Sequence, residues 1–328
     1  MDAIRHGGDL SEARAKGRAV AGWLDLSTGI NPHAYPAGIP AEALRRLPQR
    51  DAEAALIAAA RAAYRVPGEA AVAAAPGTQA ILQWLPHVIP ARTVAVVGPT
   101  YAEHAATWAR AGARVTAVAS LAEAAGADVA VVVNPNNPDG RIHAPGRLAQ
   151  FAASRADGGV RLVVDEAFGD LLPDLTVAGA AGTLVLKSFG KFYGLPGLRL
   201  GFAVGAPAVI ADLAARLGPW AVSGPALAVG AAALSDGEWA QGMRERLARE
   251  RAALDETLAS AGLPVTGGTD LFRLVETQRA ERIHEALAAE GVWTRIFDDV
   301  PGRLRIGLPG RHGARLEAAL AAACRRAA

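Results

Sequence analysis

The feature that most constrains the fold is a regular alternation of short apolar segments with alanine-rich segments, from about residue 50 to residue 205. The short segments have the length and branched side chains of buried strands, and the others have the length and composition of helices. Strands that alternate with helices form a largely parallel sheet wrapped by those helices. The pattern predicts strands at 93–97, 114–118, 129–133, 161–164, 183–186 and 200–204, and helices at 54–64, 78–85, 102–111 and 148–155.

The pattern changes after Pro219. Long helices are predicted at 225–234 and 239–261, short strands at 271–275, 293–296 and 304–307, and a closing helix at 314–326. We therefore expect a large domain over 45–220 and a smaller α+β domain over 221–328. Residues 1–44, which are rich in Gly and Pro, are predicted to form an arm that packs with the small domain.

Composition excludes several classes of protein. No apolar run reaches the roughly 18 residues of a membrane span, and the first residues lack the apolar centre of a signal peptide. The net charge of +2 comes from scattered residues, which gives no case for a nucleic-acid partner. The seven histidines show no metal-ligand spacing, so we expect no metal. The single cysteine, Cys324, fits a reducing cytoplasm.

Lysine is scarce in this chain. Of 34 lysines and arginines only three are lysines, which leaves 31 arginines, and Lys187 and Lys191 lie four residues apart. Arginine stays protonated, whereas lysine can lose its proton and attack a carbonyl. The presence of two lysines in this segment therefore indicates that an amine is needed there as a reactive group. The alternative is that the segment is an ordinary basic turn.

Polar residues follow several of the predicted strands, where active residues of parallel sheets gather. Gly77, Thr78 and Gln79 precede a helix and offer amides and a hydroxyl to a phosphate, or form an ordinary helix cap. Tyr101 is able to stack on a flat ring, or is a core tyrosine. Asn137 lies among ideal turn residues and can also donate a hydrogen bond to a ring oxygen.

The last two strand ends carry charge. Asp165 ends a buried strand, where a carboxylate requires a partner such as a protonated pyridine nitrogen, a metal ion or an arginine. Ser188, Lys191 and Arg199 supply a hydroxyl, an amine and a guanidinium within one loop. This set suits a ligand that has a phosphate and an aldehyde.

In their order and spacing, these motifs resemble the fold type I pyridoxal-phosphate enzymes of the aspartate aminotransferase superfamily over nearly the whole chain. The resemblance implies an α/β fold: a large domain with a mostly parallel seven-stranded sheet between helices, a smaller α+β domain and an N-terminal arm. It further implies that Lys191 forms the Schiff base with the cofactor and that Asp165 pairs with the pyridinium nitrogen. The other implied cofactor contacts are Gly77, Thr78, Gln79, Ser188 and Arg199 around the phosphate, Asn137 at the ring hydroxyl, Tyr101 stacked on the ring, and Phe168.

Within this superfamily the chain is most similar to the threonine-phosphate decarboxylase branch of cobalamin biosynthesis, whose neighbour is histidinol-phosphate aminotransferase. The opening His6-Gly7-Gly8 resembles the His-Gly-Gly start of that branch. Residues 25–32, Asp-Leu-Ser-Thr-Gly-Ile-Asn-Pro, resemble its arm, with Gly29 in place of an asparagine. Residues 191–199, from Lys191 to Arg199, are close to its Lys-Phe-Tyr-x-x-Pro-Gly-Leu-Arg motif.

Two departures from the superfamily pattern concern tyrosines. Many relatives have tyrosine where this chain has Phe168, and phenylalanine cannot hydrogen-bond the cofactor oxygen. Many relatives also have Tyr-Pro where this chain has Leu47-Pro48. That tyrosine reaches a phosphate across a dimer, so its replacement removes one contact of the homodimer that the resemblance implies.

Candidate substrate residues lie mainly outside the large domain. By resemblance, Arg305 holds the substrate carboxylate, and Arg295 is placed to meet a substrate phosphate together with His6 and Gly7. Gly29, Asn31 and Asn137 complete the expected substrate set. Bidentate guanidinium contacts suit both anions, although in an arginine-rich chain each arginine is also a candidate for an exposed surface residue.

Three functions remain open at this point. The first is decarboxylation of O-phospho-L-threonine to (R)-1-amino-2-propanol phosphate, with Lys191 and Asp165 as catalytic residues. The second is an aminotransferase acting on histidinol phosphate or another amino acid, which would align a different bond of the same substrate carbon. The third is a non-catalytic binding module of the cobalamin pathway, which the intact Lys191, Asp165 and Arg199 argue against.

Overall fold

The computed structural model describes residues 6–15, 22–153, 159–297 and 300–327. Its internal contacts divide the chain into a large unit, residues 34–137 and 141–240, and a small unit, residues 1–33, 138–140 and 241–328. The sequence predicted that the large domain would begin at residue 45 and end at residue 220. Residues 34–44 group with the large unit because the start of α9 (Gly224–Ser235) packs on α2 (Ala41–Arg45): a Cβ built on Gly224 would lie 2.2 Å from the carbonyl oxygen of Ala43.

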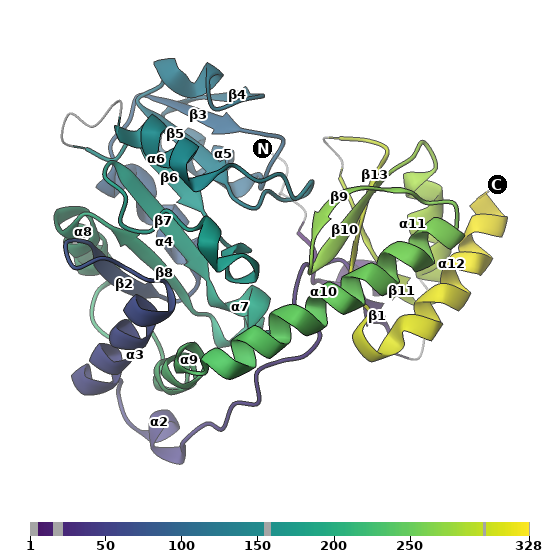
Figure 1. Ribbon diagram of the computed structural model, residues 1–328, viewed down its shortest axis with the longest axis horizontal. Coiled ribbons are helices and arrows are strands. Elements are labelled where there is room, and N and C mark those ends of the chain that lie inside the picture. The colour runs from purple at the N-terminus through teal and green to yellow at the C-terminus, as the bar shows by residue number, and fades with distance from the viewer. Residues whose placement is uncertain (1–5, 16–21, 154–158, 298–299, 328) are drawn as a thin grey trace. The chain divides into compact units, whose positions relative to one another are not determined.

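The large unit is built on a seven-stranded sheet in the order β2-β8-β7-β6-β5-β3-β4 (Figure 1). The pairs β7–β6, β6–β5, β5–β3 and β3–β4 are parallel, and β8 runs antiparallel to both of its neighbours. The expected mostly parallel sheet of seven strands is therefore confirmed. Its strands are β2 (Ala71–Ala75), β3 (Thr93–Val97), β4 (Arg114–Val118), β5 (Val129–Val133), β6 (Leu162–Asp165), β7 (Thr183–Ser188) and β8 (Gly201–Gly205).

Two apolar clusters, one on each face, enclose this sheet. Along β5 all five residues are buried, and successive residues alternate between the clusters, as expected for a strand covered on both faces. One cluster includes residues of α4 (Thr78–Val88), α5 (Glu103–Arg110) and α8 (Pro207–Leu217); the other includes residues of α6 (Pro145–Ala153). The helix α3 (Arg50–Ala63) packs along α9 and also contacts β2.

Several expected elements differ from those observed in the large unit. The segment 114–118 was expected to be a buried strand, but β4 is the edge strand and three of its five residues are exposed. The strand β2 was missed because four of its five residues are alanine, which has little strand preference. The end of the helix expected at 148–155 lies outside the described residues, since the description of α6 stops at Ala153.

The small unit contains a four-stranded antiparallel sheet, β12-β13-β10-β9, and a parallel pair of β1 with β11. The helices α11 and α12 lie side by side next to the larger of these sheets (Figure 1). The strands are β1 (Leu24–Asp25), β9 (Val265–Thr269), β10 (Phe272–Glu276), β11 (Val292–Trp293), β12 (Arg295–Ile296) and β13 (Arg303–Gly307), and the helices are α1 (Leu10–Ala15), α10 (Gly237–Ser260), α11 (Ala280–Ala289) and α12 (Gly313–Ala327). The arm strand β1 thus joins this unit through β11.

The single strand expected at 293–296 is in fact two strands of different sheets. Buried Thr294 separates them, and its Oγ1 lies 2.8 Å from Nδ1 of His284. The strand β9 and the helix α11 were not predicted. Glycine at two of the five positions of β9 hides it from a pattern based on β-branched side chains.

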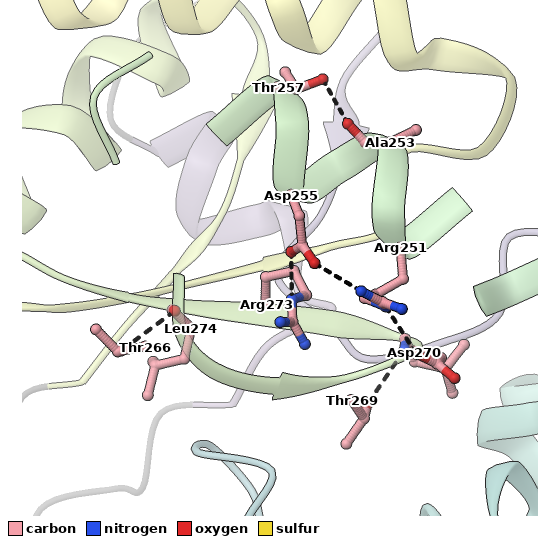
Figure 2. A network of polar contacts seen from close by, with 10 residues as sticks. Arg251, Ala253, Asp255, Thr257, Thr266, Thr269, Asp270, Arg273 and Leu274 are labelled. Atoms are coloured by element: carbon pink, nitrogen blue, oxygen red, sulfur yellow. Dashed lines mark hydrogen bonds and ion pairs between the residues drawn. The ribbon is translucent and has the colours of Figure 1, made fainter. Parts of the chain in front are cut away.

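A network of ion pairs fixes α10 to the β9–β10 hairpin (Figure 2). Asp255 on α10 accepts hydrogen bonds from Arg251, at 2.9 Å, and from Arg273 of β10, at 2.7 Å. Arg251 also donates to Asp270 in the hairpin turn at 3.1 Å. Because Asp255 is shared, the two arginines are held in one arrangement. No helix in the described part of the chain has the length and apolar character needed to cross a membrane.

Candidate active site

Five loops of the large unit meet at one edge of the sheet. The strands β2, β3, β5, β6 and β7 all run in the same direction, so the residues that follow them lie at their shared carboxyl ends. The antiparallel β8 begins at this edge, two residues after Arg199. The loops carry, in chain order, Gly77, Tyr101, Asn137, Asp165 and Lys191.

The register of β8 brings the three expected phosphate-binding segments together. Gly201 pairs with Ala75 on one side and with Ser188 on the other. Gly77 precedes α4 with a φ of 84°, and a Cβ there would lie 2.5 Å from Nη2 of Arg199. The guanidinium of Arg199 therefore sits over the amino end of α4, where Thr78 and Gln79 begin the helix. This cradle of helix amides, hydroxyls and a guanidinium is suited to a phosphate dianion.

Asp165 at the end of β6 is buried, and its partner is a histidine. Oδ2 lies 2.8 Å from Nε2 of His104 on α5, a fully buried side chain, and Oδ1 accepts a hydrogen bond from the amide of Ala167 at 2.9 Å. Both carboxylate oxygens are thus held in place. A carboxylate fixed in this way is able to keep a proton on a pyridine nitrogen, which is the role expected for Asp165.

Tyr101 is held by a chain of polar contacts. Its hydroxyl donates to Gln79 at 3.3 Å, and the amide of Gln79 donates to Glu103 at 3.1 Å. Burial, together with the charges of Glu103 and Asp165, raises the pKa of Tyr101 to about 12, although Arg199 acts in the opposite direction. The hydroxyl therefore stays protonated, and the ring stands among the charges that the cofactor would contact.

Lys191 lies in the short helix α7 (Phe189–Phe192), directly after Ser188, and is half-buried. Its Nζ is 6.0 Å from the centroid of the Phe168 ring, which is 3% exposed. Phe168 thus lies close to the amine, at the place where relatives have a phenol. Asn137 is half-buried in the loop after β5.

The structure gives Lys187 a defined partner. Its side chain is 2% exposed, and its Nζ lies 2.5 Å from Oε2 of Glu166. This buried ion pair excludes Lys187 from the role of exposed nucleophile, so Lys191 alone of the two has the position of a reactive amine.

Arg295 and Arg305 place two positive charges close together in the small unit's sheet. They are direct partners in the β12–β13 register. Arg305 is 7% exposed, donates to the carbonyl oxygen of Ser27 at 2.7 Å and lies 5.1 Å from the centroid of Phe272. Burial, together with the charge of Arg295, lowers the pKa of Arg305 to about 10, although Asp25 acts in the opposite direction. Two cations opposite each other repel, and an anionic ligand would relieve that repulsion.

The arm residues expected to bind substrate lie in the same small unit. The amide of Gly8 donates to Oγ of Ser27 at 2.8 Å, which ties the described start of the chain, His6 and Gly7, to the segment that Arg305 contacts. Gly29 and Asn31 are buried, and Oδ1 of Asn31 accepts a hydrogen bond from the amide of His33 at 2.8 Å.

The residues of the large unit fit pyridoxal phosphate. Gly77 leaves the space into which the Arg199 guanidinium reaches, and Asp165 is a buried carboxylate aimed at the same sheet end. No local sequence pattern pointed to His104, Glu103 or Glu166, because the partner of each lies on a distant segment. His104 and Asp165, for example, are 61 residues apart. Among the described residues no cluster suited to a metal ion is found.

A family model for aminotransferase class I and II matches residues 41–322. The chain belongs to the class I and II aminotransferase family. Within that family it is 48% identical to a threonine-phosphate decarboxylase of Sinorhizobium sp, over 93% of each chain, and 43% identical to the threonine-phosphate decarboxylase of Pseudomonas aeruginosa, over 97% of each chain. The resemblance predicted from the motifs is confirmed.

Solved structures of aminotransferases share this fold. The histidinol-phosphate aminotransferase of Clostridium acetobutylicum superposes with a TM-score of 0.80 at 18% identity, covering 92% of this chain and 99% of its own. The histidinol-phosphate aminotransferase of Sinorhizobium meliloti, solved in complex with pyridoxal-5'-phosphate, has a TM-score of 0.77 at 20% identity, covering 88% of this chain and 85% of its own. At these identities the likeness establishes the fold type I architecture.

Proposed function

We propose that this protein is a pyridoxal-phosphate-dependent decarboxylase that converts O-phospho-L-threonine to (R)-1-amino-2-propanol phosphate in cobalamin biosynthesis. The observation that carries the proposal is the 48% identity, over 93% of each chain, to the Sinorhizobium threonine-phosphate decarboxylase. The geometry of the large unit supports it, because Lys191, Asp165 and Arg199 lie at the sheet edge where the chemistry requires an amine, a carboxylate and a phosphate ligand.

Each of these residues has a defined task in the proposed reaction. When bound, pyridoxal phosphate supplies an aldehyde for the substrate amine and a protonated ring that withdraws electrons from the bonds of the substrate α-carbon. Arg199, Ser188, Thr78 and the amides after Gly77 bind its phosphate. Asp165, oriented by His104, holds the proton on the ring nitrogen. Lys191 would supply the amine that binds the aldehyde, and Tyr101, Gln79, Asn137 and Phe168 would orient the ring.

Recognition of the substrate falls to its two anionic groups. We assign the carboxylate to Arg305 and the phosphate to Arg295, with His6, Gly7, Gly29, Asn31 and Asn137 as further contacts. The mutual repulsion of Arg295 and Arg305 favours a doubly anionic ligand over a neutral one. In the reaction the bond from the α-carbon to the carboxylate breaks, CO₂ leaves, and a proton takes its place on that carbon.

An aminotransferase is the second candidate. The structural likeness to histidinol-phosphate aminotransferases favours it, since the same lysine, aspartate and arginine serve both reactions. The two reactions differ in the bond that is held perpendicular to the cofactor ring, the bond to the carboxylate or the bond to hydrogen.

Release of labelled CO₂ tests the proposal. Protein loaded with pyridoxal phosphate is incubated with O-phospho-L-threonine labelled at the carboxylate carbon, and the gas is trapped and counted. We expect CO₂ in amounts equal to the amine product, and none from Lys191→Ala. Transfer of the amine to 2-oxoglutarate without CO₂ release would assign the protein to the aminotransferases.

We further propose that the protein is a homodimer that works in the cytoplasm. Large apolar side chains are exposed at Ile39, Leu44, Leu47 and Trp220. Leu44 lies in α2, Ile39 and Leu47 flank this helix, and Trp220 lies just before α9, which packs on α2. One copy of this surface covering another would bury these side chains. The single cysteine in the chain fits a reducing compartment.

A further inference from the structure

Lys187 and Glu166 form a buried ion pair that the proposed reaction does not use. The exposed fractions of their side chains are 2% and 1%, and Nζ of Lys187 lies 2.5 Å from Oε2 of Glu166. The free energy needed to remove the two charges from water offsets most of their attraction. Such a pair therefore adds little to the stability of the fold by itself. The pair does, however, fix the positions of both side chains relative to each other.

The pair lies on the opposite face of the sheet from Asp165. Asp165 pairs with Leu186 in the register of β6 and β7, so the two side chains share one face. Lys187, the next residue, points to the other face, where its Nζ lies 4.9 Å from the centroid of the Tyr64 ring. The ion pair therefore lies behind the strands that carry the cofactor-facing residues.

Glu166 holds the turn that follows β6 at three points. Its amide donates to the carbonyl oxygen of Leu186 at 2.9 Å, and its own carbonyl oxygen accepts from the amide of Gly169 at 2.8 Å. Its Oε1 accepts a hydrogen bond from the amide of Val177 at 2.9 Å. With Oε2 on Lys187, the side chain links two strand ends to the turn.

The ammonium group packs directly against this turn. A Cβ built on Gly169 would lie 2.9 Å from Cβ of Glu166 and 3.2 Å from Nζ of Lys187, so no side chain fits there. Phe168 lies within the turn, between Glu166 and Gly169, and its ring is the one near the Lys191 amine, at 6.0 Å. The position of Phe168 thus depends on the residues that fix the turn.

We propose that Lys187 and Glu166 are positioning residues that hold the turn 166–169 so that Phe168 covers the Lys191 amine. The proposal deepens the proposed function by adding two residues that control access to the reactive lysine. Without the pair, the turn opens more often and water and reagents reach the amine.

The rate at which Lys191 is acetylated tests this directly. Full-length protein, freed of cofactor, is treated at fixed pH with an amine-reactive acetyl ester, and Lys191 is followed by peptide mass spectrometry. With only three lysines in the chain the assignment is simple. The variant Lys187→Met/Glu166→Leu removes both charges and leaves no lone buried charge. We expect it to label about tenfold faster than the wild type, since the turn loses its side-chain anchors.

Two further variants separate positioning from general destabilisation. Thr294→Val removes a buried contact of 2.8 Å between Oγ1 of Thr294 and Nδ1 of His284, both in the small unit, and should label at the wild-type rate. Phe168→Ala should label as fast as the pair variant, and combining it with the pair variant should add nothing. A wild-type rate in the pair variant, or a further increase in the combination, would overturn the proposal.

If Lys187→Met/Glu166→Leu does not fold, the variant Glu166→Gln can be used to test the proposal instead. It retains an acceptor for the Val177 amide but loses the ion pair, so labelling should be faster than in the wild type. An unchanged rate would contradict the role of the pair. Labelling needs neither substrate nor turnover, so a failure of the CO₂ assay would leave this result standing.

Discussion

At the scale of single residues, the chemistry rests on partners that hold each charged group. Asp165 is a useful carboxylate because His104 and the amide of Ala167 occupy fixed positions on its two oxygens. Tyr101 is restrained in the same way through Gln79 and Glu103. A group whose orientation is fixed before the cofactor binds loses little freedom when it does.

Arg305→Met should weaken substrate recognition without unfolding the protein. Losing a charge-assisted contact costs about 1.5–3 kcal/mol, so we expect kcat/KM for O-phospho-L-threonine to fall about tenfold to a hundredfold. The unfolding temperature should change by only a few degrees, because replacing a buried charge with an apolar side chain is often neutral. Steady-state kinetics and thermal unfolding on the same sample check both. Full activity in the variant would remove Arg305 from the substrate site.

The pKa of Arg305 gives a second, pH-dependent prediction. Because its pKa is lowered to about 10 in the folded protein, the folded state holds this proton more weakly than the unfolded chain. The charged side chain therefore costs stability below about pH 10, and that cost disappears as the pH rises above it. Anion binding needs the charged form. The dissociation constant of 3-phosphooxybutanoate, which has both anions but no amine, should rise above about pH 10, and this rise should be absent in Arg305→Met.

The element scale is where the sequence was most and least informative. Most predicted site residues of the large unit end or follow a strand. The parallel order of the strands brings those ends together, so the alternation of strands and helices alone predicted the neighbourhood of Asp165 and Lys191. Two contacts could not be predicted in this way: the ion pair of Lys187 with Glu166 and the contact of His104 with Asp165. Each depends on how distant strands and helices pack together, which no local sequence pattern shows. The strand β2 was missed for a different reason, since four of its five residues are alanine, which favours helix over strand.

The turn before α4 makes a prediction at this scale. Gly77→Ala forces a side chain into a backbone with φ of 84° and against the Arg199 guanidinium. We expect the dissociation constant of pyridoxal phosphate to rise about tenfold or more, in keeping with a strain of about 1–2 kcal/mol. Gly112→Ala is the matched control, because φ is 89° there but nothing lies within 4 Å of the new Cβ. Equal cofactor affinity in the two variants would mean that the α4 turn does not bind the phosphate.

For the whole molecule, the exposed apolar side chains predict an assembly. The variant Leu44→Glu/Leu47→Glu places two charges on the surface around α2, where the wild-type side chains are 70% and 61% exposed. We expect the dimer to dissociate, as measured by sedimentation velocity, because burying an unpaired carboxylate is costly. Ile142→Glu is the control. Ile142 is an exposed apolar residue as well, at 48%, but it lies on another loop of the large unit, so this variant should leave the dimer intact. A wild-type protein that sediments as a monomer would contradict the proposed homodimer.

The central claim, that this chain breaks the bond to the substrate carboxylate, is tested most directly by following the substrate carbon in D₂O. Holoenzyme is incubated with O-phospho-L-threonine in D₂O, and the products are observed by proton NMR. The account predicts 1-amino-2-propanol phosphate with one deuterium on the carbon that bears the amine, formed in the same amount as CO₂. A phosphorylated 2-oxo acid, or substrate that only exchanges its α-hydrogen and keeps its carboxylate, would contradict it.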